Sequence, residues 1–462
     1  MKEYDVIVIG SGGGAQISSS AFELGKTVAV IEKGKLGGTC LNRGCIPSKM
    51  LIHPANVASL IRSSDKLGLS VAISSIDLPG IITRINRTTN QESNELKKWH
   101  NRPHARLKFY QGSAVFVSNK VISVNGQRIT GKKIYLATGA SPFTPPIPGL
   151  DQTPYWTSTE ALRAEKAPKK LMVIGGGYIA CELGYAFSAL GSEVHWLVRD
   201  AALLTREDQT VSQEFTKIFS GRERVLFKVD IIKVEYRHGL FFIHLKSNLS
   251  SRPGEKHIIS GDALLVATGV SPNTAELGLE NTSIKTTKRG FIAVNSRLET
   301  NVKDVFAFGD CVGNYLFRHS VNFEGEFLFK SHFIKKNKKP IKYPPMPHAV
   351  FTNPEIGSVG KTELELSEKK IPYVVGFALY QNSGMGQARL SREGFVKLLF
   401  HQKTRKLLGA HILGEEASNM IHQLVYAITF KATVDNLLEM IYIHPALTEI
   451  VRNAARNALD SF

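Results

Sequence analysis

One ordered pattern constrains the fold of this chain more than any other part of its sequence: an apolar run, a glycine-rich turn, a helical stretch, a second apolar run and an acidic residue. The first apolar run, Tyr4–Ile9, leads into GSGGGA at 10–15, and the second, Thr27–Ile31, ends in Glu32. A continuous apolar run is typical of a strand that is buried on both faces of a parallel sheet. The segment is therefore expected to fold as the strand–helix–strand unit of a Rossmann-like dinucleotide-binding domain.

The residue types in this unit suit a cofactor that carries a pyrophosphate. Gly10 permits a tight turn, Gly12 lets the backbone approach the pyrophosphate, and Ala15 allows the helix to pack closely. The N-terminus of the helix offers free N–H groups and the positive end of its dipole to the phosphates. Glu32 stands 22 residues after Gly10, where a carboxylate is expected to accept hydrogen bonds from an adenosine ribose.

The same pattern recurs 165 residues later, so the sequence predicts a second dinucleotide-binding domain. Leu171–Ile174 leads into GGGYIA at 175–180, and another apolar run follows at 193–198. This run ends without the acidic residue that favours NAD; Arg199 follows it, and Arg206 lies in the next loop. A guanidinium can pair with a 2′-phosphate through two hydrogen bonds. We therefore expect NADPH as the coenzyme, with NADH as the alternative.

Three further apolar runs are interpreted as strands. Two of them end in Ala-Thr-Gly, at 137–139 and 267–269, and are predicted to mark the crossings between the two nucleotide-binding domains. The third, FAFGD at 306–310, is interpreted as a strand that ends in Asp310. At that position the carboxylate is expected to hydrogen-bond the polyol linker of a flavin.

Two cysteines, Cys40 and Cys45, lie in the segment GGTCLNRGCIPSK at 37–49. Thiols five positions apart at the start of a helical stretch can close a small loop as a disulfide, and this loop begins eight residues after Glu32. A redox-active sulfur pair beside a bound dinucleotide implies electron transfer between a nucleotide cofactor and sulfur. The other two cysteines, Cys181 and Cys311, are interpreted as packing residues, because a buried free cysteine commonly behaves as a small apolar side chain.

Composition and charge exclude several classes of protein. The chain has 462 residues, 43% of them hydrophobic and 21% charged, which predicts a globular protein of about three domains. No signal peptide is visible and no apolar run reaches the ~18 residues of a membrane span. We therefore predict a cytoplasmic protein without a membrane partner, a compartment in which a disulfide is more often catalytic than structural.

The net charge of +18 is spread along the chain, and its densest cluster, at 335–339, is interpreted as a solvated linker. No nucleic-acid-binding module is recognised, so nucleic acid is not expected as a partner. The histidines and cysteines show no metal-ligand spacing, and no metal is predicted.

These motifs resemble those of the class I, FAD-dependent pyridine nucleotide–disulfide oxidoreductases, the family that includes dihydrolipoamide dehydrogenase, glutathione reductase and mycothione reductase. GGTCLNRGCIPSK resembles the redox motif of the family, and FAFGD resembles its second FAD motif. The segments 351–360 and 408–414 are similar to its C-terminal dimerisation domain, and HPALTE at 444–449 is similar to its closing His–Glu motif. The resemblance covers essentially the whole chain.

The resemblance implies a homodimer of chains with an α/β fold and three domains. A FAD-binding domain at 1–150 resumes at 271–340, on either side of an NAD(P)H-binding domain at 151–270. A C-terminal α+β dimerisation domain occupies 341–462.

The resemblance also implies roles for single residues. Cys45 matches the charge-transfer thiol near the flavin, and Cys40 matches the interchange thiol that meets the substrate. Lys49 and Glu182 match an ion pair near the flavin and the nicotinamide, and Tyr178 matches a gate where the nicotinamide enters. The other expected cofactor contacts are Gly14, Lys33, Gly38, Thr39, Ala137, Thr138, Gly139, Gly175, Gly177, Ile179, Gly269 and Gly309.

His444 is expected to be the acid–base group, held by Glu449 and contributed by the neighbouring subunit. A histidine titrates near about pH 6.5, so it can take the proton from Cys40 and return it to the leaving thiol. A carboxylate that hydrogen-bonds the ring would fix its tautomer and favour the imidazolium.

The identity of the disulfide and the direction of electron flow stay open at this point. Arg199 favours an NADPH-driven reductase, which would pass electrons through FAD and Cys40–Cys45 to a small-molecule disulfide. Ser48-Lys49 resembles instead the dihydrolipoamide branch. The alternative is thus a dihydrolipoyl dehydrogenase, which would oxidise a dithiol with NAD⁺ inside a 2-oxoacid dehydrogenase complex. The sequence 460–462 holds no cysteine pair, which argues against mercuric reductase and large thioredoxin reductases.

Overall fold

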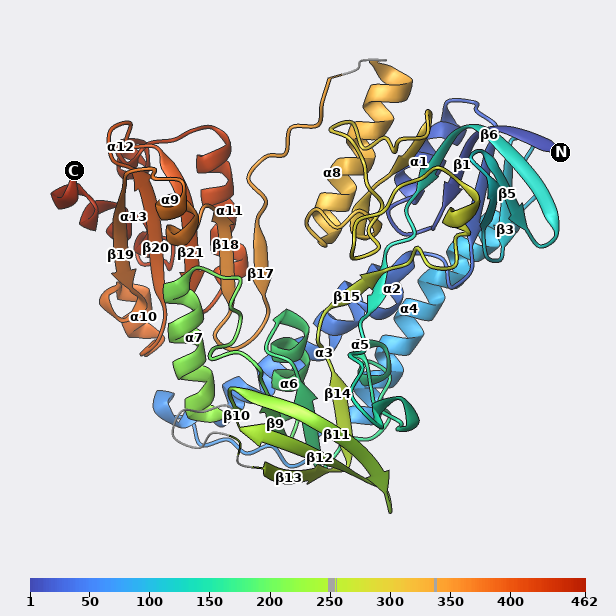
Figure 1. Cartoon of the computed structure of the whole chain (residues 1–462). Helices are drawn as coiled ribbons and strands as arrows, with labels where there is room; N and C mark the ends of the chain where they lie inside the picture. Colours follow the sequence, from blue (N-terminus) through green and yellow to red (C-terminus); the bar gives the residue numbers. More distant parts are fainter. Residues whose placement is uncertain (248–253, 255, 336–338) are drawn as a thin grey trace. The chain divides into compact units, whose positions relative to one another are not determined.

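The computed structural model describes residues 1–247, 254, 256–335 and 339–462 (Figure 1), and the basic cluster at 335–339 lies largely outside these described residues. The chain forms two compact units, and each unit is built from three segments. The first unit consists of Met1–Ser48, Ile82–Phe143 and Gly269–Lys342, and the second of Lys49–Ile81, Thr144–Thr268 and Tyr343–Phe462.

The first unit is built on a mixed sheet in which β3, β2, β1, β6 and β16 run parallel, and β5 and β4 continue it antiparallel from the first half of β6. The strands are β1 (Lys2–Ile9), β2 (Val28–Glu32), β3 (Leu107–Gln111), β4 (Val115–Ser118), β5 (Val121–Val124), β6 (Gln127–Leu136) and β16 (Val305–Ala307). The helices are α1 (Ala15–Glu23), α2 (Gly38–Arg43), α3 (Cys45–Arg62), α4 (Leu78–Asn101) and α8 (Arg318–Phe329), of which α3 and α4 cross between the units.

Burial on both faces explains why β1 is a continuous apolar run. Val8 lies in a core cluster with Ile17 of α1 and Leu328 of α8. Ile7, which points to the opposite face, lies in a second cluster with Phe116 of β4. The two short strands β7 (Ala140–Pro142) and β15 (Val270–Pro272) pair antiparallel, one after each Ala-Thr-Gly segment.

The second unit contains a parallel sheet in the order β10-β9-β8-β14, and its strands are β8 (Lys170–Ile174), β9 (Glu193–Leu197), β10 (Arg224–Leu226) and β14 (Ala263–Val266). An antiparallel sheet of β11 (Val229–Arg237), β12 (Leu240–Ser247) and β13 (Lys256–Gly261) shares a buried apolar core with it. The helices of this part are α5 (Ser158–Ala161), α6 (Tyr178–Ala189) and α7 (Gln209–Arg222).

The C-terminal segment of the second unit forms an antiparallel sheet in the order β17-β18-β21-β20-β19. Its strands are β17 (His348–Val350), β18 (Ile356–Gly360), β19 (Tyr373–Leu379), β20 (Phe395–His401) and β21 (Leu407–Leu413). Its helices are α9 (Glu363–Glu368), α10 (Gly384–Ala388), α11 (Ala417–Thr429), α12 (Val434–Glu439) and α13 (Glu449–Asn457), and α11 and α13 share one core with the sheet.

The prediction of an α/β fold with two Rossmann-like sheets and a C-terminal α+β segment is confirmed. One strand is shorter than expected, because β16 ends at Ala307 and Asp310 lies in a 3-10 turn beyond it. The structure joins the predicted coenzyme-binding and C-terminal domains in one compact unit, so the boundaries near 150, 270 and 340 stay predictions. Among the described residues, no helix combines the length and the apolar character that crossing a bilayer needs.

Candidate functional site

Two glycines of the turn after β1 have no space for a side chain. Gly10 has a φ of 101°, and a Cβ at this position would lie 2.2 Å from the carbonyl oxygen of Ala137. A Cβ on Gly14 would lie 2.1 Å from the carbonyl oxygen of Gly10. Helix α1 begins at Ala15, and no side chain caps its N-terminus. The turn therefore presents backbone N–H groups to a ligand, which fits the pyrophosphate of FAD.

A second close approach of backbone to backbone positions the cysteine segment. Gly38 has a φ of 65°, and a Cβ on it would lie 2.6 Å from the Cα atom of Gly12. Helix α2 therefore starts directly against the glycine turn, and Thr39 and Cys40 are its next two residues. Only glycine at position 38 is compatible with both the backbone conformation and this contact.

Glu32 is held in place beside the same turn. Its carboxylate accepts hydrogen bonds from the N–H and the hydroxyl of Ser11 at 2.9 and 2.8 Å, and from the N–H of Gly34 at 2.8 Å. This orientation leaves lone pairs on the carboxylate for ribose hydroxyls. Lys33, the next residue, forms an exposed ion pair with Glu276 at 2.6 Å.

Three parallel strands bring the other predicted FAD contacts to one edge of the sheet. β1, β6 and β16 run in the same direction, so Gly10, Ala137 and Gly309 all follow carboxyl ends of strands. Burial raises the pKa of Asp310, and the negative charge of Glu324 adds to this effect. Glu324 is itself fixed by the N–H of Gly309, at 2.6 Å.

The two Ala-Thr-Gly segments meet at the β7–β15 ribbon. Gly139 and Gly269 have φ values of 69° and 118°, and a Cβ on either would meet nothing within 4 Å. The carbonyl oxygen of Gly269 accepts a hydrogen bond from the N–H of Phe143 at 2.9 Å. The carbonyl oxygen of Thr138 accepts one from the side-chain amide of Asn273, also at 2.9 Å.

Cys40 lies in α2, and Cys45 is the first residue of α3. Gly44, whose backbone is not helical, separates α2 from α3 and lets the chain turn between them. The hydrogen bond between the two thiols and the burial of Cys40 raise the pKa of Cys40 well above its usual value. The two thiols are thus in direct contact, and Cys40, which is half-buried whereas Cys45 is exposed, needs a base to become a nucleophile at neutral pH.

The second glycine turn, after β8, has open space beside Gly177. Gly175 has a φ of 129°, and a Cβ there would lie 2.4 Å from the carbonyl oxygen of Ala267. A Cβ on Gly177 would meet nothing within 4 Å, so protein packing does not require glycine at this position. Helix α6 starts next, with Tyr178 and Ile179, and no side chain caps it. The open space at Gly177 suits the close approach of a pyrophosphate.

Arg199 lies one residue beyond Val198, at the carboxyl end of β9. Its side chain is 83% exposed, and its nearest carboxylate is that of Asp200, at 3.8 Å. The loop that leads on to Arg206 is anchored to the glycine turn, because the N–H of Leu204 donates to the carbonyl oxygen of Gly176 at 2.8 Å. Arg199 is therefore available to an anionic ligand at this end of the sheet.

Lys49 and Glu182 form an ion pair within the second unit. The ammonium group lies 2.8 Å from one carboxylate oxygen of Glu182. The other oxygen accepts a hydrogen bond from the N–H of Phe351 at 3.0 Å, and the ammonium group lies 4.2 Å from the centre of the Phe351 ring. Glu182 is a buried residue of α6, so this pair fixes Lys49 of α3 against α6.

Tyr178, the predicted gate, has partners that sequence reasoning did not identify. Its hydroxyl donates to Glu207 at 2.5 Å, and its ring stacks on that of His348. Glu207 precedes α7 and His348 begins β17, so only the folded chain brings the three residues together.

His444 and Glu449 are joined as the sequence predicts. The Nδ1 atom of His444 lies 3.2 and 3.0 Å from the two carboxylate oxygens of Glu449. The N–H of Ala446 and the guanidinium of Arg452 also donate to this carboxylate, at 3.2 and 2.8 Å. Burial raises the pKa of Glu449, but these hydrogen bonds and the charge of Arg452 outweigh it and lower the pKa. The imidazole itself is 75% exposed, and its Nε2 atom is left for a substrate proton.

Cys181 and Cys311 are both fully buried, which agrees with their interpretation as packing residues. Burial raises the pKa of each thiol, and that of Cys311 reaches about 11. Within the part of the chain that the structure describes, no three His, Cys, Asp or Glu side chains are grouped so that they could hold a metal ion.

Comparison with known proteins places the chain among flavoenzymes. The family model "Pyridine nucleotide-disulphide oxidoreductase" matches residues 4–325, and that of its dimerisation domain matches 346–455. A mercuric reductase of Staphylococcus aureus is 33% identical over 458 residues, which are 98% of this chain and 82% of that protein. A mitochondrial dihydrolipoyl dehydrogenase of Arabidopsis thaliana is 31% identical over 467 residues, 99% and 91% of the two chains.

A solved structure has the same fold along its whole length. It is the HOCl-induced flavoprotein disulfide reductase RclA from Escherichia coli, with a TM-score of 0.86 and 27% sequence identity. The match covers 98% of this chain and 99% of that one.

Proposed function

Because this chain belongs to the pyridine nucleotide–disulphide oxidoreductase family, whose members use FAD and NAD(P)H, we propose that it reduces a small-molecule disulfide with electrons from NADPH. The observation that carries this proposal is the contact between the thiols of Cys40 and Cys45. Cys40 lies in α2, the helix that starts against the glycine turn after β1. The net reaction converts NADPH, one proton and one disulfide into NADP⁺ and two thiols.

The first unit offers residues that fit FAD. The backbone of the turn at 10–15 would hold the pyrophosphate, Glu32 the ribose, and Asp310 the polyol linker. When bound, the flavin would accept two electrons from NADPH and supply them to the Cys40–Cys45 disulfide.

Thiol–disulfide exchange then needs only protein side chains. The Cys40 thiolate attacks one sulfur of the substrate disulfide, a mixed disulfide forms, and the first product thiol leaves with a proton. Cys45 then attacks the sulfur of Cys40, the second product thiol leaves, and the Cys40–Cys45 disulfide is restored. The two protons of the dithiol end on the two product thiols.

His444 would carry these protons. The raised pKa of Cys40 means that the thiol does not ionise readily without a base. Because Glu449 accepts from Nδ1, the ring presents Nε2 as the atom that takes the proton from Cys40 and returns it to the leaving thiol.

A homodimer would complete this arrangement, with His444 supplied by the second subunit. In the single chain, several large apolar side chains of the C-terminal segment are exposed, and Ile441 is the extreme at 99%. Tyr426, Phe430 and Ile443 are among them. Exposed apolar side chains in a segment that matches a dimerisation domain are expected to be covered by a second copy.

The second candidate is a dihydrolipoyl dehydrogenase, which runs the same exchange in the opposite direction with NAD⁺. The full-length likeness to the Arabidopsis enzyme favours it. Arg199 argues against it. An acidic residue at the end of β9 would select NAD, but the chain has the exposed guanidinium of Arg199 just after this strand.

A comparison of three reactions tests the proposal. Purified, flavin-loaded protein is assayed with NADPH and a panel of oxidised low-molecular-weight thiols, with NAD⁺ and dihydrolipoamide, and with NADPH and mercuric ion. The third arm is included because mercuric reductases are among the relatives. The proposal requires the highest kcat/KM in the first arm; a higher value in the second or third arm would contradict it.

A further inference from the structure

The hydroxyl of Tyr178 is engaged by a buried carboxylate. Tyr178 is the first residue of α6 and follows directly on the glycine turn that is expected to bind the coenzyme. Its hydroxyl donates to Glu207 Oε1 at 2.5 Å. Its ring stacks on that of His348, with the ring centres 5.9 Å apart and the planes at 18°. The tyrosine is thus held both at its tip and across its face.

Glu207 is saturated with donors. Its side chain is completely buried, and three groups bind it: the Tyr178 hydroxyl, the Nε2 atom of His348 at 2.9 and 3.0 Å, and the Ser358 hydroxyl at 2.9 Å. Burial alone raises the pKa of Glu207, but the hydrogen bond and charge of His348, with the other two hydrogen bonds, lower it. The side chain is therefore a carboxylate, and its bond to Tyr178 is charge-assisted.

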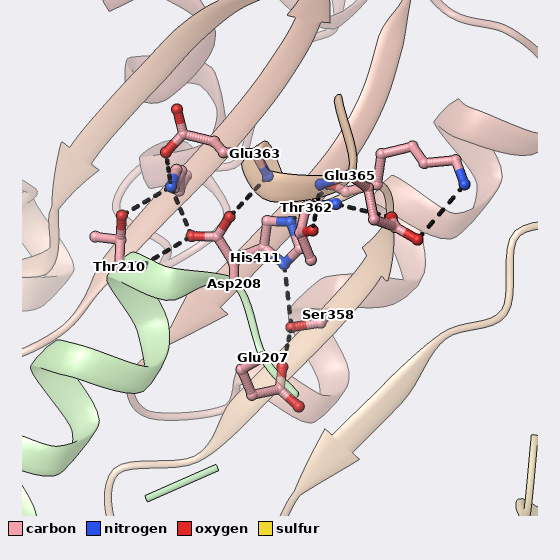
Figure 2. Close-up of polar contacts among 10 residues, drawn as sticks. Glu207, Asp208, Thr210, Ser358, Thr362, Glu363, Glu365 and His411 are labelled. Carbon is pink, nitrogen blue, oxygen red and sulfur yellow. Dashed lines mark hydrogen bonds and ion pairs between the residues drawn. The ribbon is translucent and has the colours of Figure 1, made fainter. Parts of the chain in front are cut away.

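The backbone beside Glu207 is fixed by the next residue, Asp208. The carboxylate of Asp208 caps α7 through the N–H of Thr210 at 3.1 Å and accepts the N–H of Glu363 at 3.1 Å. Figure 2 shows Asp208 between Thr210 and Glu363, and Ser358 between Glu207 and His411. The carboxylate that binds Tyr178 therefore belongs to a densely hydrogen-bonded part of the second unit.

We propose that Glu207 and His348 are positioning residues that hold Tyr178 over the nicotinamide site and so set the apparent affinity for the coenzyme. The inference rests on the proposed function, in which Tyr178 is the gate that the nicotinamide displaces. Displacement must break the charge-assisted bond to Glu207 and remove the ring from His348. A ligand that binds only the displaced conformation has its apparent affinity reduced by the fraction of molecules in that conformation.

The test is a double-mutant cycle on the reduction of the flavin by NADPH, followed anaerobically in a stopped-flow spectrometer. Tyr178→Phe removes the donor of the charge-assisted bond, Glu207→Gln removes the charge of its acceptor, and both keep the side-chain shape. Each is expected to lower the apparent Kd for NADPH by about tenfold, the factor that corresponds to one such bond. If Glu207 acts through Tyr178, adding Glu207→Gln to Tyr178→Phe should change the Kd by less than about twofold.

Two results overturn the inference. The first is that Glu207→Gln leaves the Kd unchanged. The second is that Glu207→Gln shifts the Kd equally in the wild-type and Tyr178→Phe backgrounds, which would mean that the charge of Glu207 acts on the coenzyme directly. His348→Phe keeps the stacking but loses the hydrogen bond to Glu207; it should shift the Kd in the same direction by a smaller factor. This variant decides the matter if Glu207→Gln does not fold.

A matched control is Glu235→Gln, which breaks another glutamate–histidine contact of the second unit, that of Glu235 with His244 at 2.7 Å. It should leave the Kd unchanged. Re-oxidation of the reduced protein by a disulfide should be equal in wild type and Glu207→Gln, which separates positioning of the gate from general damage. A wild-type flavin that neither NADPH nor NADH reduces would refute the proposed function itself, whereas a normal wild type with an unresponsive Glu207→Gln refutes only the inference.

Discussion

Lys397 is the residue whose removal should destabilise the second unit most clearly. It lies in β20 with its side chain only 2% exposed, and its ammonium group contacts Asp208 at 2.6 Å and Thr210 at 2.8 Å. It also pairs with Glu363, which is partly exposed. Lys397→Met would leave Glu363 free to turn to solvent, but Asp208 would stay buried without its ammonium partner.

The expected cost follows from the loss of this partner. Breaking a buried ion pair by removing one partner costs about 3–5 kcal/mol, whereas replacing both partners by uncharged groups is often nearly neutral. Lys397→Met should therefore lower the free energy of unfolding by about 3–5 kcal/mol. The double variant Asp208→Asn/Lys397→Met should recover most of this loss, because asparagine can still cap α7.

Urea unfolding at constant FAD concentration measures these changes, and hydrogen exchange of the α7 amides localises them. The control is Lys217→Met, which removes the exposed pair of Lys217 with Glu214 and should cost less than about 0.5 kcal/mol. The reasoning is refuted if Lys397→Met costs no more than this control, or if the double variant is less stable than the single one.

Four further predictions concern the site. Cys40→Ser should abolish disulfide turnover but preserve flavin reduction by NADPH, and unchanged turnover would remove Cys40 from the mechanism. His444→Ala should slow re-oxidation by a disulfide about 10²–10⁴-fold; equal slowing of flavin reduction would indicate a structural role. Arg199→Ala should reduce the ratio of kcat/KM for NADPH over NADH at least about tenfold, and an unchanged ratio would exclude contact with a 2′-phosphate. Because folding lowers the pKa of Glu449, its stabilising contribution is present above its unfolded pKa of about 4.3 and is lost as the pH falls through the lower folded pKa. The stability difference between wild type and Glu449→Gln, measured by urea unfolding, should therefore shrink below about pH 4.3, and a difference that is independent of pH would contradict this.

Local sequence patterns predicted the glycine turns and their strands well. The apolar runs at 4–9 and 171–174 became β1 and β8 with shifts of one or two residues at their starts. The backbone at Gly10 makes the turn that was expected, and the structure adds a close approach to the backbone of Ala137. The strand, the turn and the helix are adjacent in the chain, so one short segment contains the whole signal.

The partners of Tyr178 were not predictable in this way. Glu207 and His348 are 141 residues apart, and each stands at an element boundary where a polar residue is ordinary. Lys397 does carry a sequence signal. It is the single charged residue in the apolar strand FVKLLF, and a lysine in a buried strand needs an acidic partner. That partner, Asp208, is 189 residues away, so the sequence could suggest a pair but not its members.

The most direct test of the central claim follows the sulfur of Cys40 and Cys45 during one turnover. The flavin-loaded, oxidised protein is given NADPH without oxygen or substrate, quenched in acid, alkylated and analysed as peptides by mass spectrometry. We predict that a Cys40–Cys45 cross-link disappears and that both residues become alkylated, while a following addition of the disulfide substrate restores the cross-link. An oxidised protein without this cross-link, or a cross-link that NADPH leaves intact, would contradict the account.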